Sequence, residues 1–334
     1  MAVILRPDMF NAEDLYVDLT GVVGRALYVK CEGFNFAGSV KLKAAAAMLA
    51  AAEEAGTLGP DSVIVESSSG NLGVALSMIA ASRGHRFLCV TDARCSTDRR
   101  RAMEAYGATV HVIEEPDPEG GFLGARLRYV RRLCAVDRRF VWLNQYENAC
   151  NWQVHEQVTA PAIARVFPEL DVLFVGTGTA GTLMGCARYF RASGRRVAVV
   201  AVDAVGSVTF GAPPGPRMIP GLGAGVRPPL LDLAYVDDVV HVAEMESIRT
   251  CRRMARAGFL FGGSTGTVTA GALRWLAEYR PDGDAVAVAI APDLGGHYLE
   301  TVYNDDWVTT TYGEEGTDMP VAAGRSSAPT GWPA

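Results

Sequence analysis

The chain has 334 residues, of which 49% are hydrophobic and 20% are charged, and its formal net charge is −6 at pH 7. This composition is typical of a folded protein with a sizeable core in one or two domains, and the acidic balance excludes the basic surface of a nucleic-acid-binding protein. Because no apolar run is long enough to cross a bilayer and the N-terminus lacks the apolar segment of a secretion signal, we expect a cytoplasmic protein without membrane partners.

Apolar runs of strand length alternate with helical patterns along the chain. In order, the strands are expected at 27–30, 62–66, 86–91, 109–114, 140–143, 171–176, 197–203, 238–242 and 285–291. The helices are expected at 41–56, 72–83, 96–106, 122–135, 152–166, 181–192, 245–257, 267–279 and 296–303. This alternation predicts an α/β fold with mostly parallel sheets, whose strands are apolar along most of their length because helices cover both faces.

The number of strands predicts two sheets and two domains, with a boundary near 144–151, where the pattern breaks. The Gly- and Pro-rich stretch 204–235 is interpreted as a long functional loop region. The tail after about residue 312 is rich in Gly, Ser, Pro and Thr, and we expect it to be disordered.

Cysteine and histidine give no metal-site pattern. The seven cysteines are scattered, none forms a C-x-x-C pair, and most are expected to be small buried residues in a reducing compartment: Cys31, Cys89, Cys95, Cys134, Cys150, Cys186 and Cys251. The histidines also lack metal-ligand spacing, and structural roles are expected for all five: His85, His111, His155, His241 and His297. No metal ligand is therefore predicted.

Lysine occurs only at Lys30, Lys41 and Lys43, which leaves 28 arginines among the 31 basic residues. Arginine can replace lysine as a surface charge, but its guanidinium stays protonated and cannot form a Schiff base. Lys41 stands at the start of an alanine-rich helix, where the helix dipole and desolvation favour the neutral amine. We interpret Lys41 as the candidate catalytic amine, Lys30 and Lys43 as surface lysines, and the arginine run 99–101 as a solvated helix face.

Two further loops follow a strand and open a helix, and a third lies between a short apolar run and a helix. The loop 67–73 carries three serines and two glycines, whose hydroxyl and backbone N–H groups suit a carboxylate. The loop 176–182 can cradle a phosphate in the same way. The loop 262–266, with the sequence Gly-Gly-Ser-Thr-Gly, could be a simple helix cap on its own.

The loop 176–182 also spells G-x-G-x-x-G, and Asp203 ends the next strand 22 positions after Gly181. This is the pattern of a dinucleotide site, so a nicotinamide-dependent oxidoreductase is a competing hypothesis. It leaves Lys41 and the serine loop without a role, and the motif begins only after a full α/β region.

At Lys41 and these three loops the chain resembles the fold-type II pyridoxal-phosphate enzymes, the cysteine synthase and cystathionine β-synthase family. The resemblance runs in order from about residue 27 to residue 303. It implies a tryptophan synthase β-like fold of two three-layer αβα domains: a larger cofactor-binding domain from 1–41 plus 151–311 and a smaller mobile substrate-binding domain at 42–150, with 312–334 as the tail. A homodimer is implied by the same analogy.

The resemblance also implies the site residues. Lys41 would hold pyridoxal 5'-phosphate as a Schiff base, Asn71 would contact the ring oxygen of the cofactor, and Ser264 would pair with its pyridine nitrogen. The phosphate would lie in the loop formed by Gly178, Thr179, Ala180, Gly181 and Thr182. The substrate would be bound by Ser67, Ser68, Ser69, Gly70, Gln145 and Gly221. A neutral serine at the pyridine nitrogen disfavours transamination and permits β-replacement.

Several positions depart from plain cysteine synthases, namely Phe36, Leu42, Lys43, Leu72 and Ala180. Other segments resemble the branch of the family that makes N-(2-amino-2-carboxyethyl)-L-glutamate, a precursor of 2,3-diaminopropionate in siderophores and peptide antibiotics: 33–41, 120–123, 144–146, 203–207 and 303–307. This implies β-replacement on O-phospho-L-serine by the amine of L-glutamate, with phosphate as the second product.

The anionic second substrate would need cationic or hydrogen-bonding partners. By family position these are Arg126 and Tyr146, with Arg217 as a weaker candidate, although Arg126 could equally be an exposed helix arginine. Two further alternatives stay open. A cysteine synthase that uses O-acetylserine or O-phosphoserine with sulfide shares every cofactor motif, and a non-catalytic binding protein could have kept the fold.

Overall fold

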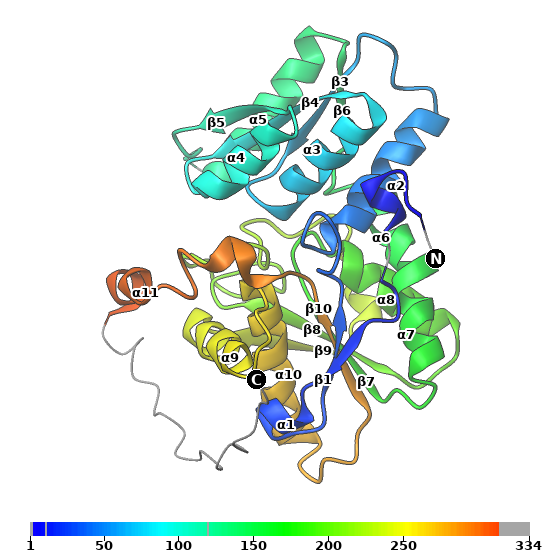
Figure 1. The fold of residues 1–334 in the computed structure, drawn as a ribbon, viewed down its shortest axis with the longest axis vertical. Helices are drawn as coiled ribbons and strands as arrows, with labels where there is room; N and C mark the ends of the chain where they lie inside the picture. Colours follow the sequence, from blue (N-terminus) through cyan, green and yellow to red (C-terminus); the bar gives the residue numbers. More distant parts are fainter. Residues whose placement is uncertain (1–2, 11, 119, 314–334) are drawn as a thin grey trace, which may run out of the picture.

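The computed structural model describes residues 3–10, 12–118 and 120–313. Their strands form two sheets (Figure 1). The six-stranded sheet has the order β1 (Tyr16–Asp18), β2 (Tyr28–Cys31), β10 (Ala287–Ala291), β7 (Val172–Gly176), β8 (Ala198–Ala204) and β9 (Asp238–Val242). The four-stranded sheet has the order β5 (Thr109–Ile113), β4 (Arg86–Asp92), β3 (Val63–Ser67) and β6 (Phe140–Trp142).

All neighbouring strands are parallel except β1 and β2. The predicted α/β fold with mostly parallel sheets is therefore confirmed. The four-stranded sheet takes all its strands from 63–142, while the larger sheet draws on both ends of the described chain. The exact domain limits at 41 and 150, and any motion between the two parts, stay a prediction.

The helices cover the sheets and fill the junction between them. Their bounds are α1 (Thr20–Val23), α2 (Lys41–Glu54), α3 (Asn71–Arg83), α4 (Thr97–Ala105), α5 (Gly121–Val136), α6 (Cys150–Val154), α7 (Ala160–Val166), α8 (Gly181–Ala192), α9 (Glu244–Arg256), α10 (Gly263–Tyr279) and α11 (Asp305–Tyr312). Short 3-10 helices occur at Pro7–Met9, Leu233–Tyr235 and Gly295–Tyr298, and a π-helix at His155–Thr159 joins α6 to α7. Figure 1 shows α3, α4 and α5 with the smaller sheet, and α2 and α6 where the two parts meet.

Buried apolar side chains explain why these segments fold as they do. The strand β10 is buried at every position, because it lies inside the larger sheet with helices on both faces. Nine consecutive residues of α3 are buried, as expected for a helix packed on several sides. Within the described residues, no helix is both long and apolar enough to cross a membrane.

Three sequence expectations about elements differ from the structure. The helix predicted at 296–303 is only a 3-10 turn, and the true helix α11 follows it and extends to Tyr312. The disordered tail expected after about residue 312 stays a prediction, because 314–334 lie outside the described residues. The helix predicted at 152–166 is interrupted by the π-helix, and residues 263–266 form the first turn of α10 rather than a loop.

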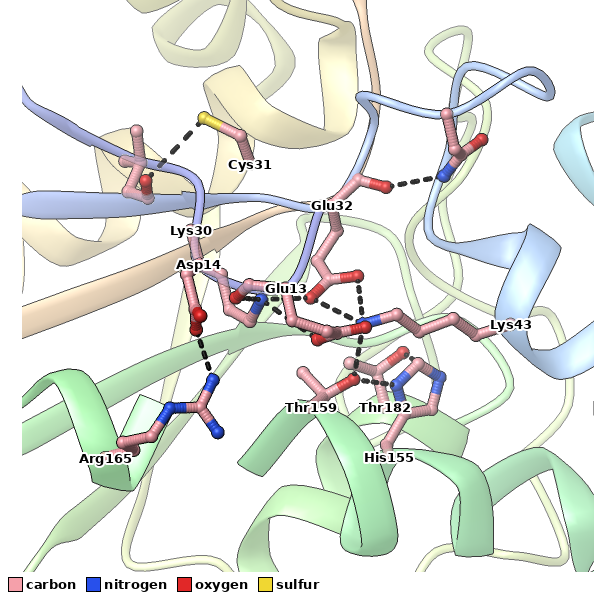
Figure 2. A network of polar contacts seen from close by, with 12 residues as sticks. Glu13, Asp14, Lys30, Cys31, Glu32, Lys43, His155, Thr159, Arg165 and Thr182 are labelled. Carbon is pink, nitrogen blue, oxygen red and sulfur yellow. Dashed lines mark hydrogen bonds and ion pairs between the residues drawn. The ribbon is translucent and has the colours of Figure 1, made fainter. Parts of the chain in front are cut away.

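The expectation that Lys30 and Lys43 are surface lysines is also wrong. The Lys30 side chain is 0% exposed and the Lys43 side chain 11% exposed, and both pair with carboxylates of Glu13 and Glu32 (Figure 2). The interpretation of 99–101 as a solvated helix face is wrong for Arg99, because this residue is only 3% exposed. The chain has therefore kept lysine at the catalytic candidate and in a buried ion-pair cluster beside it.

Candidate active site

A cavity of about 380 Å³ is lined by residues from both parts of the molecule. Lys41 contributes to its wall as the first residue of α2. Burial lowers the pKa of the Lys41 amine, and the nearby Asp293 carboxylate opposes this effect only in part. The neutral amine, which can act as nucleophile or base, is thereby favoured.

The loop after β3 forms a second side of the cavity, with Ser68, Ser69, Gly70 and Asn71 in the wall. The Ser68 hydroxyl oxygen accepts hydrogen bonds from the backbone N–H groups of Gly73, at 3.0 Å, and Gly70, at 3.3 Å. Ser68 thus shapes the start of α3 from within the loop. The N-terminus of this helix is well suited to a carboxylate.

The fully buried Ser67 does not line the cavity, unlike its neighbours in the loop. Its backbone carbonyl accepts a hydrogen bond from Gln145 Nε2 at 2.8 Å. Ser67 therefore fixes Gln145, which does line the cavity. The predicted direct contact between Ser67 and substrate has no support in this geometry.

The loop from Gly178 to Thr182 faces the cavity at the N-terminus of α8. Ala180 has the left-handed backbone φ of 67°, which costs a non-glycine residue about 1 kcal/mol and explains why a glycine would suit this position. The Asn151 amide donates to Thr179 Oγ1 at 3.0 Å. Backbone N–H groups at a helix start, with threonine hydroxyls held beside them, form a cradle that fits a phosphate.

Ser264 also lines the cavity, in the first turn of α10. Gly221 packs directly against it: a methyl carbon added at Gly221 would lie 2.2 Å from Ser264 Oγ and 3.7 Å from the Tyr298 hydroxyl. That hydroxyl donates to Asp293 Oδ2 at 2.5 Å. Burial raises the pKa of Tyr298, so its hydroxyl stays protonated beside Ser264.

The remaining wall is rich in arginine, contributed by Arg94, Arg99, Arg126, Arg131, Arg217 and Arg227. Arg126 is 5% exposed, its Nε lies 3.2 Å from Asp92 Oδ2, and its buried Nη1 makes no hydrogen bond. The sequence left open whether Arg126 is an exposed helix arginine, and its burial excludes that interpretation. Among the described residues Glu147 is the one acid of this wall, so the cavity favours anionic ligands.

Sequence reasoning missed Glu66, a fully buried carboxyl behind this wall. It accepts hydrogen bonds from the backbone N–H groups of Ser67, at 2.8 Å, and Gln145, at 3.1 Å, and from Trp142 Nε1 at 3.0 Å. Burial raises its pKa to about 7 despite these donors and the nearby Arg126 guanidinium. Glu66 therefore holds together two segments that supply the cavity wall.

Asn151, Asp293 and His155 were also missed as supporting residues, because each acts through another side chain. One signal was available: Asp293 stands two residues after the end of β10, and the ends of parallel strands collect functional groups. The other predicted residues are brought together as expected, since Lys41, Asn71, Tyr146, Gly221 and Ser264 all line one cavity.

The sequence profile of the family described as pyridoxal-phosphate dependent enzyme matches residues 16–293. The chain belongs to this family. Its cofactor is therefore pyridoxal 5'-phosphate, and the cavity contains a lysine, a phosphate cradle and a neutral hydroxyl at places that fit the group. Asp203, in contrast, is buried outside the cavity wall, and the hypothesis of a nicotinamide-dependent oxidoreductase is wrong.

Two curated proteins named N-(2-amino-2-carboxyethyl)-L-glutamate synthase are similar to this chain. The one from Ralstonia nicotianae is 40% identical over 84% of this chain and 83% of its own length. The one from Cupriavidus metallidurans is 38% identical over 87% of both.

Solved structures agree on the fold. An O-acetylserine dependent cystathionine beta-synthase from Helicobacter pylori superposes with a TM-score of 0.82 at 26% identity, covering 91% of this chain and all of its own. An O-ureido-L-serine synthase superposes with a TM-score of 0.77 at 34% identity, covering 84% of this chain and 90% of its own.

Proposed function

We propose that the protein joins O-phospho-L-serine and L-glutamate by β-replacement, giving N-(2-amino-2-carboxyethyl)-L-glutamate, a precursor of 2,3-diaminopropionate, and phosphate. The observation that carries this proposal is the match to two synthases of that product at 40% and 38% identity over more than four fifths of each chain. The arginine-rich wall supports it, because both substrates carry several negative charges.

Pyridoxal phosphate, when bound, withdraws electrons from the α-carbon of the amino acid attached to it. Lys41 Nζ takes the proton from this carbon and returns it later, which its lowered pKa favours. Ser69, Gly70 and Asn71 bind the first substrate's carboxylate at the start of α3. At the β-carbon the bond to the phosphate oxygen breaks and that oxygen keeps the electron pair. A bond to the neutral glutamate amine forms, and the proton that the amine loses ends on the leaving phosphate, which is released as hydrogen phosphate.

Arg126 and Tyr146 are the proposed partners of L-glutamate. The free Nη1 of Arg126 can donate to a carboxylate in the cavity. The Tyr146 hydroxyl makes only a long contact, 3.5 Å, to the Ser67 carbonyl and can therefore turn toward a ligand. Movement of residues 42–150 toward the larger part would exclude water during the reaction. We also propose a cytoplasmic homodimer, by analogy with the family.

A cysteine synthase is the second candidate. The similar O-acetylserine dependent cystathionine beta-synthase supports only the use of O-acetylserine as first substrate on this fold, not sulfide as the second. It would need the same Lys41, phosphate cradle and Ser264. Sulfide, however, is small and carries no carboxylate, so it supplies no acceptor for the Nη1 of the buried Arg126.

The test is phosphate release from O-phospho-L-serine with L-glutamate or sulfide, with the product identified by mass spectrometry. We expect release to depend on L-glutamate and to yield the condensation product.

Arg126→Gln should raise the KM for L-glutamate about tenfold or more, since a hydrogen bond to a charged group contributes about 1.5–3 kcal/mol. The exposed Arg132 of the same helix provides the control, Arg132→Gln. Turnover with sulfide and none with L-glutamate would favour the cysteine synthase.

A further inference from the structure

A buried ion-pair cluster includes Lys43 of α2, two residues from Lys41, together with Lys30, Glu13 and Glu32 (Figure 2). Lys43 Nζ contacts Glu13 Oε1 at 2.6 Å and Glu32 Oε2 at 2.7 Å, and Lys30 Nζ contacts Glu32 Oε1 at 2.9 Å. Although burial acts to raise it, Lys43 and Lys30 hold the pKa of Glu32 below its ordinary value. The cluster thus balances two cations with two carboxylates and fixes the Lys43 ammonium in place.

A line of hydrogen bonds leads from this ammonium to the phosphate cradle. Lys43 Nζ donates to Thr159 Oγ1 at 3.1 Å. Thr159 Oγ1 lies 3.0 Å from His155 Nδ1, and His155 Nε2 lies 3.2 Å from Thr182 Oγ1. Thr182 is the last residue of the cradle and lines the cavity. Lys43, Thr159, His155 and Thr182 are called the relay below.

The groups at the two ends of the relay fix which atom donates and which accepts in each of its hydrogen bonds. A lysine ammonium only donates hydrogen bonds, and a phosphate dianion only accepts them. If each hydroxyl passes a hydrogen bond onward, Thr159 donates to Nδ1 and Nε2–H donates to Thr182. The Thr182 hydroxyl proton is then left to point at the phosphate, and aligned bonds of this kind strengthen one another.

The imidazole in the middle must be neutral for this arrangement, because the cation has no acceptor nitrogen. His155 is 1% exposed, and its burial, together with the positive charge of Lys43, lowers its pKa to about 3. The residues 155–159 also form a π-helix, a rare wide turn that often marks functional sites. The π-helix therefore carries both Thr159 and His155, which are hydrogen-bonded to each other in the relay.

We propose that Lys43, Thr159 and His155 are positioning residues that hold the Thr182 hydroxyl as a hydrogen-bond donor to the cofactor phosphate. The proposal concerns the cofactor alone and does not depend on which amino acids react. A purely structural role would affect every ligand of the cavity equally, whereas the relay acts only on a ligand that carries a phosphate.

The experiment compares the apo-protein's dissociation constants for pyridoxal 5'-phosphate and for pyridoxal, which lacks the phosphate, by equilibrium dialysis. Thr159→Val should weaken the phosphorylated compound about tenfold, equal to about 1.4 kcal/mol, and leave pyridoxal within about twofold. Thr159→Ser keeps the hydroxyl and should restore binding. The control is Thr269→Val, since the fully buried Thr269 hydroxyl makes no hydrogen bond. Equal losses for both compounds, or no loss, would overturn the proposal.

A second variant pair tests the imidazole itself. Asparagine at position 155 ends near the place of Nδ1, whereas glutamine reaches that of Nε2, so His155→Gln should bind the phosphorylated compound more tightly than His155→Asn. If these variants do not fold, nitrogen-15 NMR of the histidine-labelled holoenzyme decides. A proton on Nε2 of His155 supports the relay, and a proton on Nδ1 overturns it.

Discussion

Lys41 and Lys43 are two positions apart on α2, yet their surroundings give them different chemistry. The Lys43 ammonium is held between two carboxylates. Lys41 makes no ion pair among the described residues, and its pKa is lowered by burial. At the scale of single residues, the site thus separates a reactive amine from a fixed cation.

The first prediction follows from this difference. Lys41→Ala should remove the visible absorbance of the Schiff base and reduce turnover by about 10³-fold or more, since both the covalent anchor and the proton carrier are lost. Lys43→Arg keeps the charge in the cluster and should retain the absorbance band. A Lys41→Ala protein that still shows the band would contradict the assignment of Lys41.

Gly221 is a second residue whose identity the structure explains. Its φ of 115° is unfavourable for other residues, and an added methyl carbon would lie 2.2 Å from Ser264 Oγ. Gly221→Ala should therefore destabilise the fold by about 1–3 kcal/mol and weaken cofactor binding, measured by urea unfolding and cofactor titration. Gly21→Ala, at a helical position with free space around it, should stabilise the fold by about 0.4–1 kcal/mol and leave cofactor binding unchanged. Unchanged cofactor affinity in Gly221→Ala would contradict this prediction, because it would show that displacing Ser264 does not weaken cofactor binding.

At the scale of elements, the strands of the sheet interiors could be predicted because buried parallel strands are runs of apolar residues. The strand β1 was missed, since Tyr16–Asp18 is short and is defined by its antiparallel pairing with β2. The helix α11 had a signal that could have been used: Asn304 caps its N-terminus by accepting from the Trp307 N–H, and two aspartates follow. The 3-10 turn before it depends on the contacts of Tyr298, which no local pattern contains.

Glu66 makes the stability of the element pair β3 and β6 depend on pH. Its folded pKa of about 7 lies above the ordinary 4.5, so the folded state binds a proton in this interval that the unfolded chain does not. Its contribution is fully present below about pH 4.5 and is lost as the pH rises through about 7, on the order of 3 kcal/mol in all.

Glu66→Gln should therefore flatten the fall in the free energy of unfolding between pH 5 and pH 8, as measured by urea titration at several pH values. Asp61→Asn removes an exposed carboxyl near the same strand and should leave the wild-type slope unchanged. A Glu66→Gln profile parallel to that of the wild type would show that Glu66 does not carry this dependence.

At the scale of the whole molecule, the cavity is made by residues that meet across the two sheets. Arg99 of α4 places its guanidinium 5.2 Å from the centroid of the Tyr298 ring, which belongs to the larger part. Loops that follow strands could be predicted as site segments, because each carries its own motif. The relay could not, since Lys43 and Thr159 are 116 positions apart and carry no motif in common.

The proposed closure of residues 42–150 has a direct consequence. Adding O-phospho-L-serine and L-glutamate together should slow amide hydrogen exchange in α4 and in the loop around Arg217, because both contribute to the cavity wall. The helix α7, remote from the cavity wall, serves as the internal reference. Equal exchange with and without substrates in all three segments would rule out closure.

A visible absorbance titration of the cofactor-loaded protein distinguishes L-glutamate from sulfide as the second substrate. O-phospho-L-serine is added first, and L-glutamate or sulfide is then added in separate runs. We expect that O-phospho-L-serine shifts the absorbance band and that only L-glutamate restores it, because the L-glutamate amine adds at the β-carbon and the product then leaves. Restoration by sulfide, with no response to L-glutamate, would contradict this expectation.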